Sequence, residues 1–97
     1  MFGDGALPFE SDQFDMVVVD DTNGMFAALA EGTRVAFLHE ARRVVRQGGR
    51  IEVVEGMKSR PQDYDVLRDL SAVGFKPVRV LAERDGFRFA EGLRAYA

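Results

Sequence analysis

Residues 14–19 read FDMVVV, and the aspartates Asp20 and Asp21 follow them directly. Three consecutive valines without polar alternation predict a strand that is covered on both faces, which is typical of a parallel sheet in an α/β domain. The run DDTNG over residues 20–24 predicts the end of that strand, because it is rich in residues that favour turns. This stretch therefore predicts a buried parallel strand that ends in an acidic loop.

Downstream of this strand the sequence predicts two helices and a second strand. A short helix is expected over residues 25–30, and Thr33 is suited to cap a longer one. The longer helix has one apolar stripe at helical spacing, and His39 is expected on its exposed side. Gly48-Gly49 predicts a turn into a strand over residues 50–54. The stripe consists of Phe37, Leu38, Ala41, Val44 and Val45.

The last third of the chain predicts a helix and a hairpin. Pro61 suits the first turn of a helix that ends near Gly74. Strands are expected over residues 78–82 and 87–93, and the Asp85-Gly86 pair between them is typical of a hairpin turn. Alternating strands and helices require a parallel sheet with crossover helices, to which the hairpin adds an antiparallel strand. No repeat or linker interrupts the pattern, so residues 1–97 are expected to form one α/β domain.

The composition excludes several classes of function. The chain has 97 residues, of which 46% are hydrophobic and 30% charged, as in an ordinary soluble globular protein. It has no cysteine and one histidine, which argues against a disulfide framework, and we expect no metal site. A net charge of −3 offers no electrostatic reason to bind nucleic acid, and no apolar run is long enough to span a bilayer. We therefore expect a cytoplasmic protein with neither a nucleic-acid nor a membrane partner.

Three segments, in this order, carry a resemblance to one family. They are GDGALPFESDQFDMVVVDD at residues 3–21, LHEARRVVRQGGRIEVVE at residues 38–55 and LRDLSAVGFKPVRVLAERDGFRFAEG at residues 67–92. They resemble, respectively, the acidic loop and fourth strand, the helix and fifth strand, and the last helix and hairpin of class I S-adenosylmethionine-dependent methyltransferases of the small-molecule type. The resemblance implies the C-terminal half of a Rossmann-like methyltransferase sheet. Its strands would be equivalent to 4-5-7-6, with the last strand antiparallel and with crossover helices.

The resemblance also implies residues that bind the adenine of S-adenosyl-L-methionine. Leu7 and Phe9 would form apolar walls against the purine. The carboxylate of Asp4 would accept a hydrogen bond from the exocyclic amine, and the amide of Gly5 would donate one to a ring nitrogen. Only Ala6 separates Gly5 from Leu7, whereas the family usually has two residues there, so Asp4 would be displaced by one residue from the adenine edge.

The two aspartates after the first strand are further candidates. Asp20 and Asp21 are expected just past the carboxyl end of a parallel strand, where open α/β sheets place their ligands. There they would meet the methionine part of the cofactor or the substrate. The alternative is that they cap the following segment and form loop hydrogen bonds. No catalytic residue is implied, because methyl transfer can run largely on positioning, and the small-molecule acceptor stays unassigned.

Two elements that the resemblance implies have no counterpart in the sequence. One is a glycine-rich loop after the first strand of the fold, since Gly3-Asp4-Gly5 lacks the flanking strand and helix. The other is an acidic residue at the end of the second strand of the fold, which would bind the ribose hydroxyls. We therefore expect that the chain alone binds the cofactor very weakly, if at all, and is inactive.

Two alternatives remain open. The first is a non-catalytic half-fold that acts as a dimeric assembly module. The strand over residues 14–19 contains no proline or lysine and is expected at an open sheet edge, where a second copy would pair with it. The second and weaker alternative is a receiver-like domain with Asp20 as phosphoacceptor. No earlier strand supplies the acidic pair that would hold magnesium, and Lys76-Pro77 leads into a strand rather than a helix.

Overall fold

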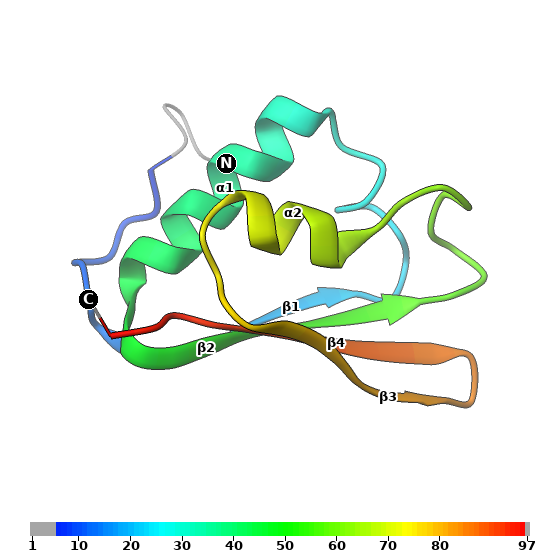
Figure 1. Cartoon of the computed structure of the whole chain (residues 1–97). Coiled ribbons are helices and arrows are strands. Elements are labelled where there is room, and N and C mark those ends of the chain that lie inside the picture. The colour runs from blue at the N-terminus through cyan, green and yellow to red at the C-terminus, as the bar shows by residue number, and fades with distance from the viewer. Residues whose placement is uncertain (1–5, 97) are drawn as a thin grey trace.

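A mixed four-stranded sheet lies against two helices in the computed structural model, which describes residues 6–96 (Figure 1). In the sheet order β1-β2-β4-β3, β1 runs parallel to β2, and β4 is antiparallel to both of its neighbours. This order and the antiparallel β4 confirm the predicted equivalent of 4-5-7-6. The elements are β1 (Phe14–Asp21), α1 (Glu31–Val44), β2 (Val45–Gly56), α2 (Val66–Ala72), β3 (Val78–Arg84) and β4 (Phe87–Leu93).

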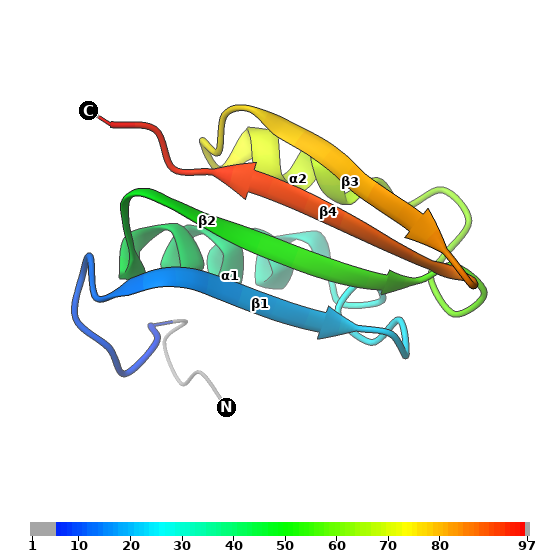
Figure 2. The ribbon, with the colours of Figure 1, turned by 90° about the horizontal axis from the view of Figure 1, so that it is seen from below.

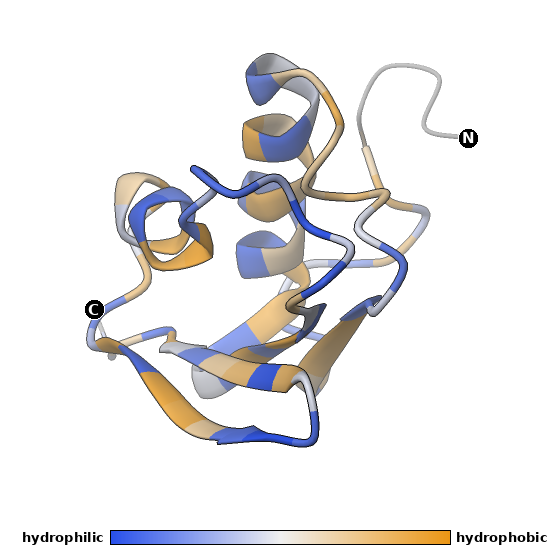
Figure 3. Ribbon diagram, turned by 90° about the vertical axis from the view of Figure 1, so that its right-hand side faces the viewer, coloured by the Kyte–Doolittle hydropathy of each residue, from blue (hydrophilic) through white to orange (hydrophobic). Residues whose placement is uncertain are grey.

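Both helices pack on the same face of the sheet, which Figure 2 shows from the opposite side. Between the layers lies a core of residues with at most 4% of their surface exposed, because apolar side chains from α1, α2 and the strands meet there. Figure 3 shows the hydrophobic segments along the strands and in both helices. The core residues are Leu38, Ala41, Ile51, Val53, Val66, Leu70, Val73, Phe75 and Ala90.

The second face of β1 is exposed, so the prediction that this strand is covered on both faces is wrong. Val17 and Val19 pack against the core, whereas Val18 is 54% exposed and Met16 is 40% exposed. Side chains alternate between the two faces of a strand, and no helix within residues 6–96 covers the face on which Met16 and Val18 lie. Within residues 6–96, the valine run of β1 is therefore covered on one face only.

The start of α1 and its junction with β2 differ from the prediction. Ala30 is the N-cap residue and provides no side-chain cap, so Thr33 lies inside the first turn. Val45 begins β2 directly after α1. The Gly48-Gly49 pair lies within β2, where the register with β1 shifts. A Cβ atom on Gly49 would lie 2.6 Å from the carbonyl oxygen of Asp15, so glycine allows the two backbones to approach at this point.

Residues 25–30 form turns and not the predicted helix, because the chain there folds back onto the carboxylate of Asp21. The helix expected from Pro61 begins instead at Val66. Asp65 is its N-cap, and the Asp65 carboxylate accepts a hydrogen bond from the amide of Leu67 at 3.1 Å. The later turns are as predicted. Positive φ angles occur at Gly74, where α2 has ended, and at both Asp85 and Gly86 in the hairpin turn between β3 and β4.

Candidate functional site

The carboxyl ends of β1 and β2 lie side by side at one end of the sheet, beside the turn between β3 and β4. Asp21 of β1 is the register partner of Glu55 of β2, and the amide of Met57 donates a hydrogen bond to the carbonyl oxygen of Gly86 at 2.9 Å. Open α/β sheets bind ligands outside the carboxyl ends of their parallel strands. An open cavity of about 370 Å³ lies at these carboxyl ends. It is lined by Thr22, Gly56, Lys58, Ser59, Asp85, Gly86 and Phe87.

The lining combines polar groups with an apolar surface. Lys58 supplies an ammonium group, Thr22 and Ser59 supply hydroxyl groups, and Phe87 is an aromatic residue that is 39% exposed. A Cβ atom on Gly56 would lie 2.1 Å from the carbonyl oxygen of Thr22, so the two strand ends are in backbone contact there. The cavity is therefore suited to a small ligand with a flat apolar part and an anionic or hydrogen-bonding group.

Asp20 is an exposed residue at the carboxyl end of β1, and its side chain is a carboxylate. Its Oδ1 atom accepts a hydrogen bond from the amide of Thr22 at 3.1 Å. Hydrogen bonds from the amide and the hydroxyl of Thr22 lower the pKa of Asp20, because they stabilise its charged form. Asp20 is therefore ionised at neutral pH and accessible from solvent.

Asp21 is buried, with 1% of its surface exposed. Its Oδ1 accepts a hydrogen bond from the amide of Phe26 at 2.7 Å, and its Oδ2 accepts one from the amide of Ala27 at 3.1 Å. These contacts match the alternative of capping and loop hydrogen bonding. The prediction that Asp21 meets a ligand stays a prediction.

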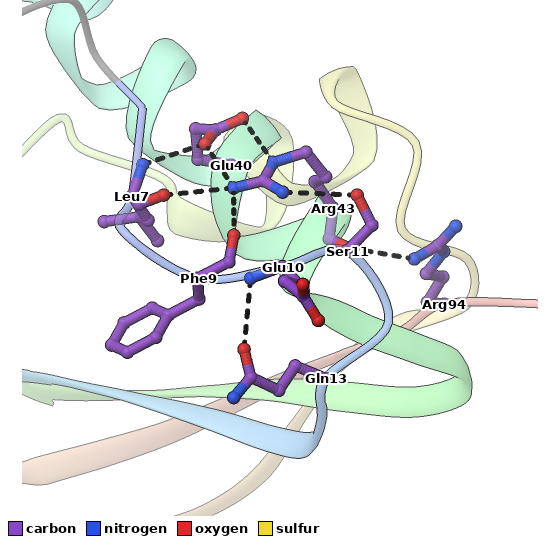
Figure 4. A network of polar contacts seen from close by, with 8 residues as sticks. All are labelled: Leu7, Phe9, Glu10, Ser11, Gln13, Glu40, Arg43 and Arg94. Carbon is purple, nitrogen blue, oxygen red and sulfur yellow. Dashed lines mark hydrogen bonds and ion pairs between the residues drawn. The ribbon is translucent and has the colours of Figure 1, made fainter.

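Leu7 and Phe9 lie in the segment before β1, which two residues of α1 hold in place (Figure 4). The amide of Leu7 donates to Oε1 of Glu40 at 2.8 Å. The guanidinium of Arg43 donates to the carbonyl oxygens of Leu7 and Phe9 at 3.1 and 2.8 Å. Phe9 is 46% exposed, and its ring meets the ring of Phe14 edge-on, with 5.0 Å between the centroids.

One copy of the chain does not bring all the predicted site residues together. Phe9 lies beside Phe14 at the amino end of β1, whereas Asp20 and Asp21 lie at its carboxyl end. Six residues of extended strand separate Phe14 from Asp20 by about 20 Å. The adenine-contact prediction for Leu7 and Phe9 stays a prediction, and Asp4 and Gly5 lie outside the described residues.

A polar cluster between the helices was not anticipated from the sequence. Tyr64 donates its hydroxyl to Oδ2 of Asp69 at 2.8 Å, and Nε of Arg34 reaches the same oxygen at 2.9 Å. The Arg34 guanidinium also lies over the Tyr64 ring, 4.9 Å from its centroid. Burial and the hydrogen bond to Asp69 raise the pKa of Tyr64. No local signal points to this cluster, because Arg34 and Asp69 are 35 positions apart.

Two properties bear on the remaining predictions. None of the helices among the described residues is long and apolar enough to cross a membrane. Within residues 6–96, no group of three or more His, Cys, Asp or Glu side chains is placed to hold a metal ion.

Comparison with known proteins shows similarity in structure alone, since no family model and no curated protein sequence matches the chain. A methyltransferase from Aquifex aeolicus described as SAM dependent matches 94% of this chain with a TM-score of 0.70 and 18% identity, and 51% of that structure is covered. A T. Thermophilus 16S rRNA methyltransferase in complex with AdoMet and guanosine matches 91% of the chain with a TM-score of 0.64 and 17% identity. Human N-acetylserotonin methyltransferase in complex with SAM matches 84% with a TM-score of 0.67 and 15% identity.

The extent of these matches determines what they show. The chain spans 22% of the T. Thermophilus structure and 30% of the human one, and 60% of a Thermotoga maritima methyltransferase. Sequence identities this low show that the fold is shared, and they do not show the substrate or the partner. S-adenosylmethionine or its demethylated product is bound in several of the matched structures and is the cofactor of this fold. The chain therefore has a class I methyltransferase-like α/β fold, over a part of the length of the proteins that share it.

Proposed function

We propose that this chain is part of an S-adenosylmethionine-dependent methyltransferase that acts on a small molecule, and that alone it binds the cofactor very weakly and does not catalyse. The observation that carries the proposal is the sheet order β1-β2-β4-β3, in a chain that matches methyltransferases over most of its own length but only part of theirs. When bound, S-adenosylmethionine supplies its sulfonium methyl group to a nucleophilic carbon, oxygen or nitrogen. We also propose that this protein is located in the cytoplasm.

The residues at the carboxyl ends of β1 and β2 are suited to bind the small molecule that would accept the methyl group. Asp20 is ionised and would accept hydrogen bonds from an ammonium or hydroxyl group. Lys58 and Ser59 line the neighbouring cavity and would hold an anionic or polar group against the ring of Phe87. These groups would bind and orient the acceptor, which is the main requirement of methyl transfer.

The weak binding follows from how the cofactor-binding candidates are distributed. Neither strand-to-helix connection among the described residues, TNGMFAALA at 22–30 or MKSRPQDYD at 57–65, contains a glycine-rich loop. Phe9 and Asp20 suit the adenine and a hydrogen-bond donor of the cofactor, but β1 separates them by about 20 Å. One copy therefore offers only isolated contacts with the ligand.

Calorimetry with S-adenosylmethionine and S-adenosylhomocysteine tests this proposal. We expect no saturable binding to the chain below about millimolar concentration, equivalent to less than about 4 kcal/mol of binding free energy. Circular dichroism must show in the same sample that the chain is folded. A micromolar dissociation constant, or methyl transfer by the chain alone, would show that this part of the proposal is wrong.

A second candidate function is that of a non-catalytic assembly module that forms a homodimer through residues 14–19. It is supported by the exposure of Met16 and Val18 at the edge of the sheet. Light scattering at tens of micromolar would show a dimer for the wild type and a monomer for Val18→Lys. A wild-type monomer would exclude this candidate, and a dimer unaffected by the lysine would place the contact elsewhere.

A further inference from the structure

Three connections of the chain are joined to one another at the carboxyl ends of β1 and β2. The β1–α1 connection touches the β2–α2 connection at Gly24, where a Cβ atom would lie 2.4 Å from the carbonyl oxygen of Ser59. The β2–α2 connection in turn is bonded to the β3–β4 turn, because the amide of Met57 donates to the carbonyl oxygen of Gly86 at 2.9 Å. Figure 2 shows the end of β2 beside this turn. The cavity at these ends therefore has walls that backbone contacts hold in place before any ligand binds.

Two side chains of opposite charge line this cavity from different connections. Lys58 comes from the β2–α2 connection, and Asp85 comes from the turn between β3 and β4. Asp85 and Gly86 both have positive φ angles, of 55° and 83°, which is the backbone of a tight hairpin turn. Neither the Lys58 nor the Asp85 side chain has an ion-pair or hydrogen-bond partner among residues 6–96. Both charges are therefore available to a ligand in the cavity.

The rest of the lining is suited to a ligand that carries both charges. Phe87, 39% exposed, supplies an apolar contact, and the hydroxyl groups of Thr22 and Ser59 can donate to an anionic group or accept from a cationic one. A simple anion would leave Asp85 without a partner, and a simple cation would leave Lys58 without one. A volume of about 370 Å³ is near the lower end of the range for small-molecule sites. These features together match a small zwitterion with an apolar part.

We propose that this cavity binds a small zwitterion of the α-amino-acid class as the methyl acceptor. Its carboxylate lies toward Lys58, its ammonium group toward Asp85 and its apolar side chain against Phe87. The inference rests on the methyltransferase function proposed above and names the substrate class of the same site. It makes Asp85, at the tip of the hairpin, a residue that determines specificity.

Titration of the 97-residue chain with L-phenylalanine tests the proposal, with amide chemical shifts measured by NMR at low salt. The amides of residues 22, 56–59 and 85–87 should shift. Phenethylamine lacks the carboxylate and 3-phenylpropionate lacks the ammonium group, whereas both keep the ring. L-Phenylalanine should bind about two- to fivefold more tightly than either analogue, because that is the effect of one exposed charge pair.

Two variants should each affect a different analogue. Lys58→Met should weaken the binding of 3-phenylpropionate about two- to fivefold and should not weaken that of phenethylamine. Asp85→Asn should do the reverse, and asparagine tolerates the positive φ of this position, so the turn is kept. Lys76→Met and Asp63→Asn are the matched controls, because they change the net charge equally at exposed residues outside the cavity. Both controls should bind all three compounds as the wild type does.

Several results would overturn the proposal. They are equal affinities of the three compounds for the wild type, equal losses in the control variants, and no saturable shift of these amides up to about 20 mM L-phenylalanine. S-adenosylhomocysteine also carries an amino-acid group, so saturation of the same amides by it at a lower concentration would assign the cavity to the cofactor instead. The titrations with L-phenylalanine need no cofactor. Their failure is therefore distinct from failure of the methyltransferase proposal, which calorimetry tests.

Discussion

The hydroxyl oxygen of Tyr64 lies 2.8 Å from Oδ2 of Asp69, the carboxylate oxygen that also accepts from Arg34 at 2.9 Å. This carboxylate joins α1 to α2, and its side chain is 9% exposed. Asp69→Asn should lower the free energy of unfolding by about 1–3 kcal/mol, because the amide no longer carries the charge that pairs with Arg34. Asp63→Asn, a change at an exposed residue of the connection before α2, should alter the free energy of unfolding by no more than about 0.5 kcal/mol in urea unfolding.

Tyr64 should also make stability depend on pH in the alkaline range. Burial first, and then the hydrogen bond to Asp69, raise its pKa above the ordinary value of 10.0. Only the unfolded state then releases the Tyr64 proton just above that value. The contribution is therefore complete below pH 10 and is lost as the pH rises further. In urea unfolding from about pH 8 to 11, Tyr64→Phe should flatten the decline in stability, whereas Tyr96→Phe should not. An equal decline in all three proteins would contradict this prediction.

Asp21 and Asp20 should differ in their effect on stability although they are neighbours. Asp21→Ala leaves the amides of Phe26 and Ala27 without their acceptor, and we expect a loss of about 2–3 kcal/mol. Asp20→Ala removes an exposed side chain and should change stability by less than about 0.5 kcal/mol. Thermal unfolding followed by circular dichroism measures both. Similar melting temperatures for the two variants would show that Asp21 does not hold the turn.

Two glycines predict opposite effects of the same substitution. A Cβ atom at Gly56 would lie 2.1 Å from the backbone carbonyl oxygen of Thr22, so Gly56→Ala should destabilise by about 1–3 kcal/mol. At Gly32, in the first turn of α1, a Cβ atom meets nothing within 4 Å. Gly32→Ala should stabilise the protein by about 0.5–1 kcal/mol, because alanine has less freedom to lose on folding. Shifts of the denaturant midpoint in the same direction for the two variants would contradict this prediction.

The segment before β1 should loosen in acid. Hydrogen bonds from the side chain of Arg43 and the amide of Leu7 lower the pKa of Glu40 below its ordinary value of 4.5. The stability that Glu40 contributes is therefore present above pH 4.5 and is lost as the pH falls through the lowered value. Amide hydrogen exchange of residues 6–13 should quicken over this range, after correction for intrinsic exchange. Glu40→Gln should exchange faster already at pH 7, whereas Glu10→Gln should behave as the wild type.

The sequence by itself determined the elements that depend on neighbouring residues. The valine run of β1, the apolar stripe of α1 as far as Val44 and the Asp85-Gly86 turn are local patterns, and each lies where it was predicted. The order of strands and helices predicted a parallel pair with a crossover helix and an antiparallel hairpin, whereas the sheet order was implied by the family resemblance. Such features follow from backbone sterics and from burial of one face of each element, which a single stretch of chain displays.

Only the tertiary structure decided which side chains meet. Arg34 turns inward because Asp69, 35 positions away, supplies a buried carboxylate. Asp21 and Asp20 are adjacent in sequence, but the chain folds back to give Asp21 two backbone donors and leaves Asp20 in solvent. Phe9 was predicted to contact the adenine and Asp20 the methionine part of the same cofactor or the substrate, and the length of β1 separates the two residues. The distance between two groups depends on the path of the chain between them, and residue types along the sequence do not contain that path.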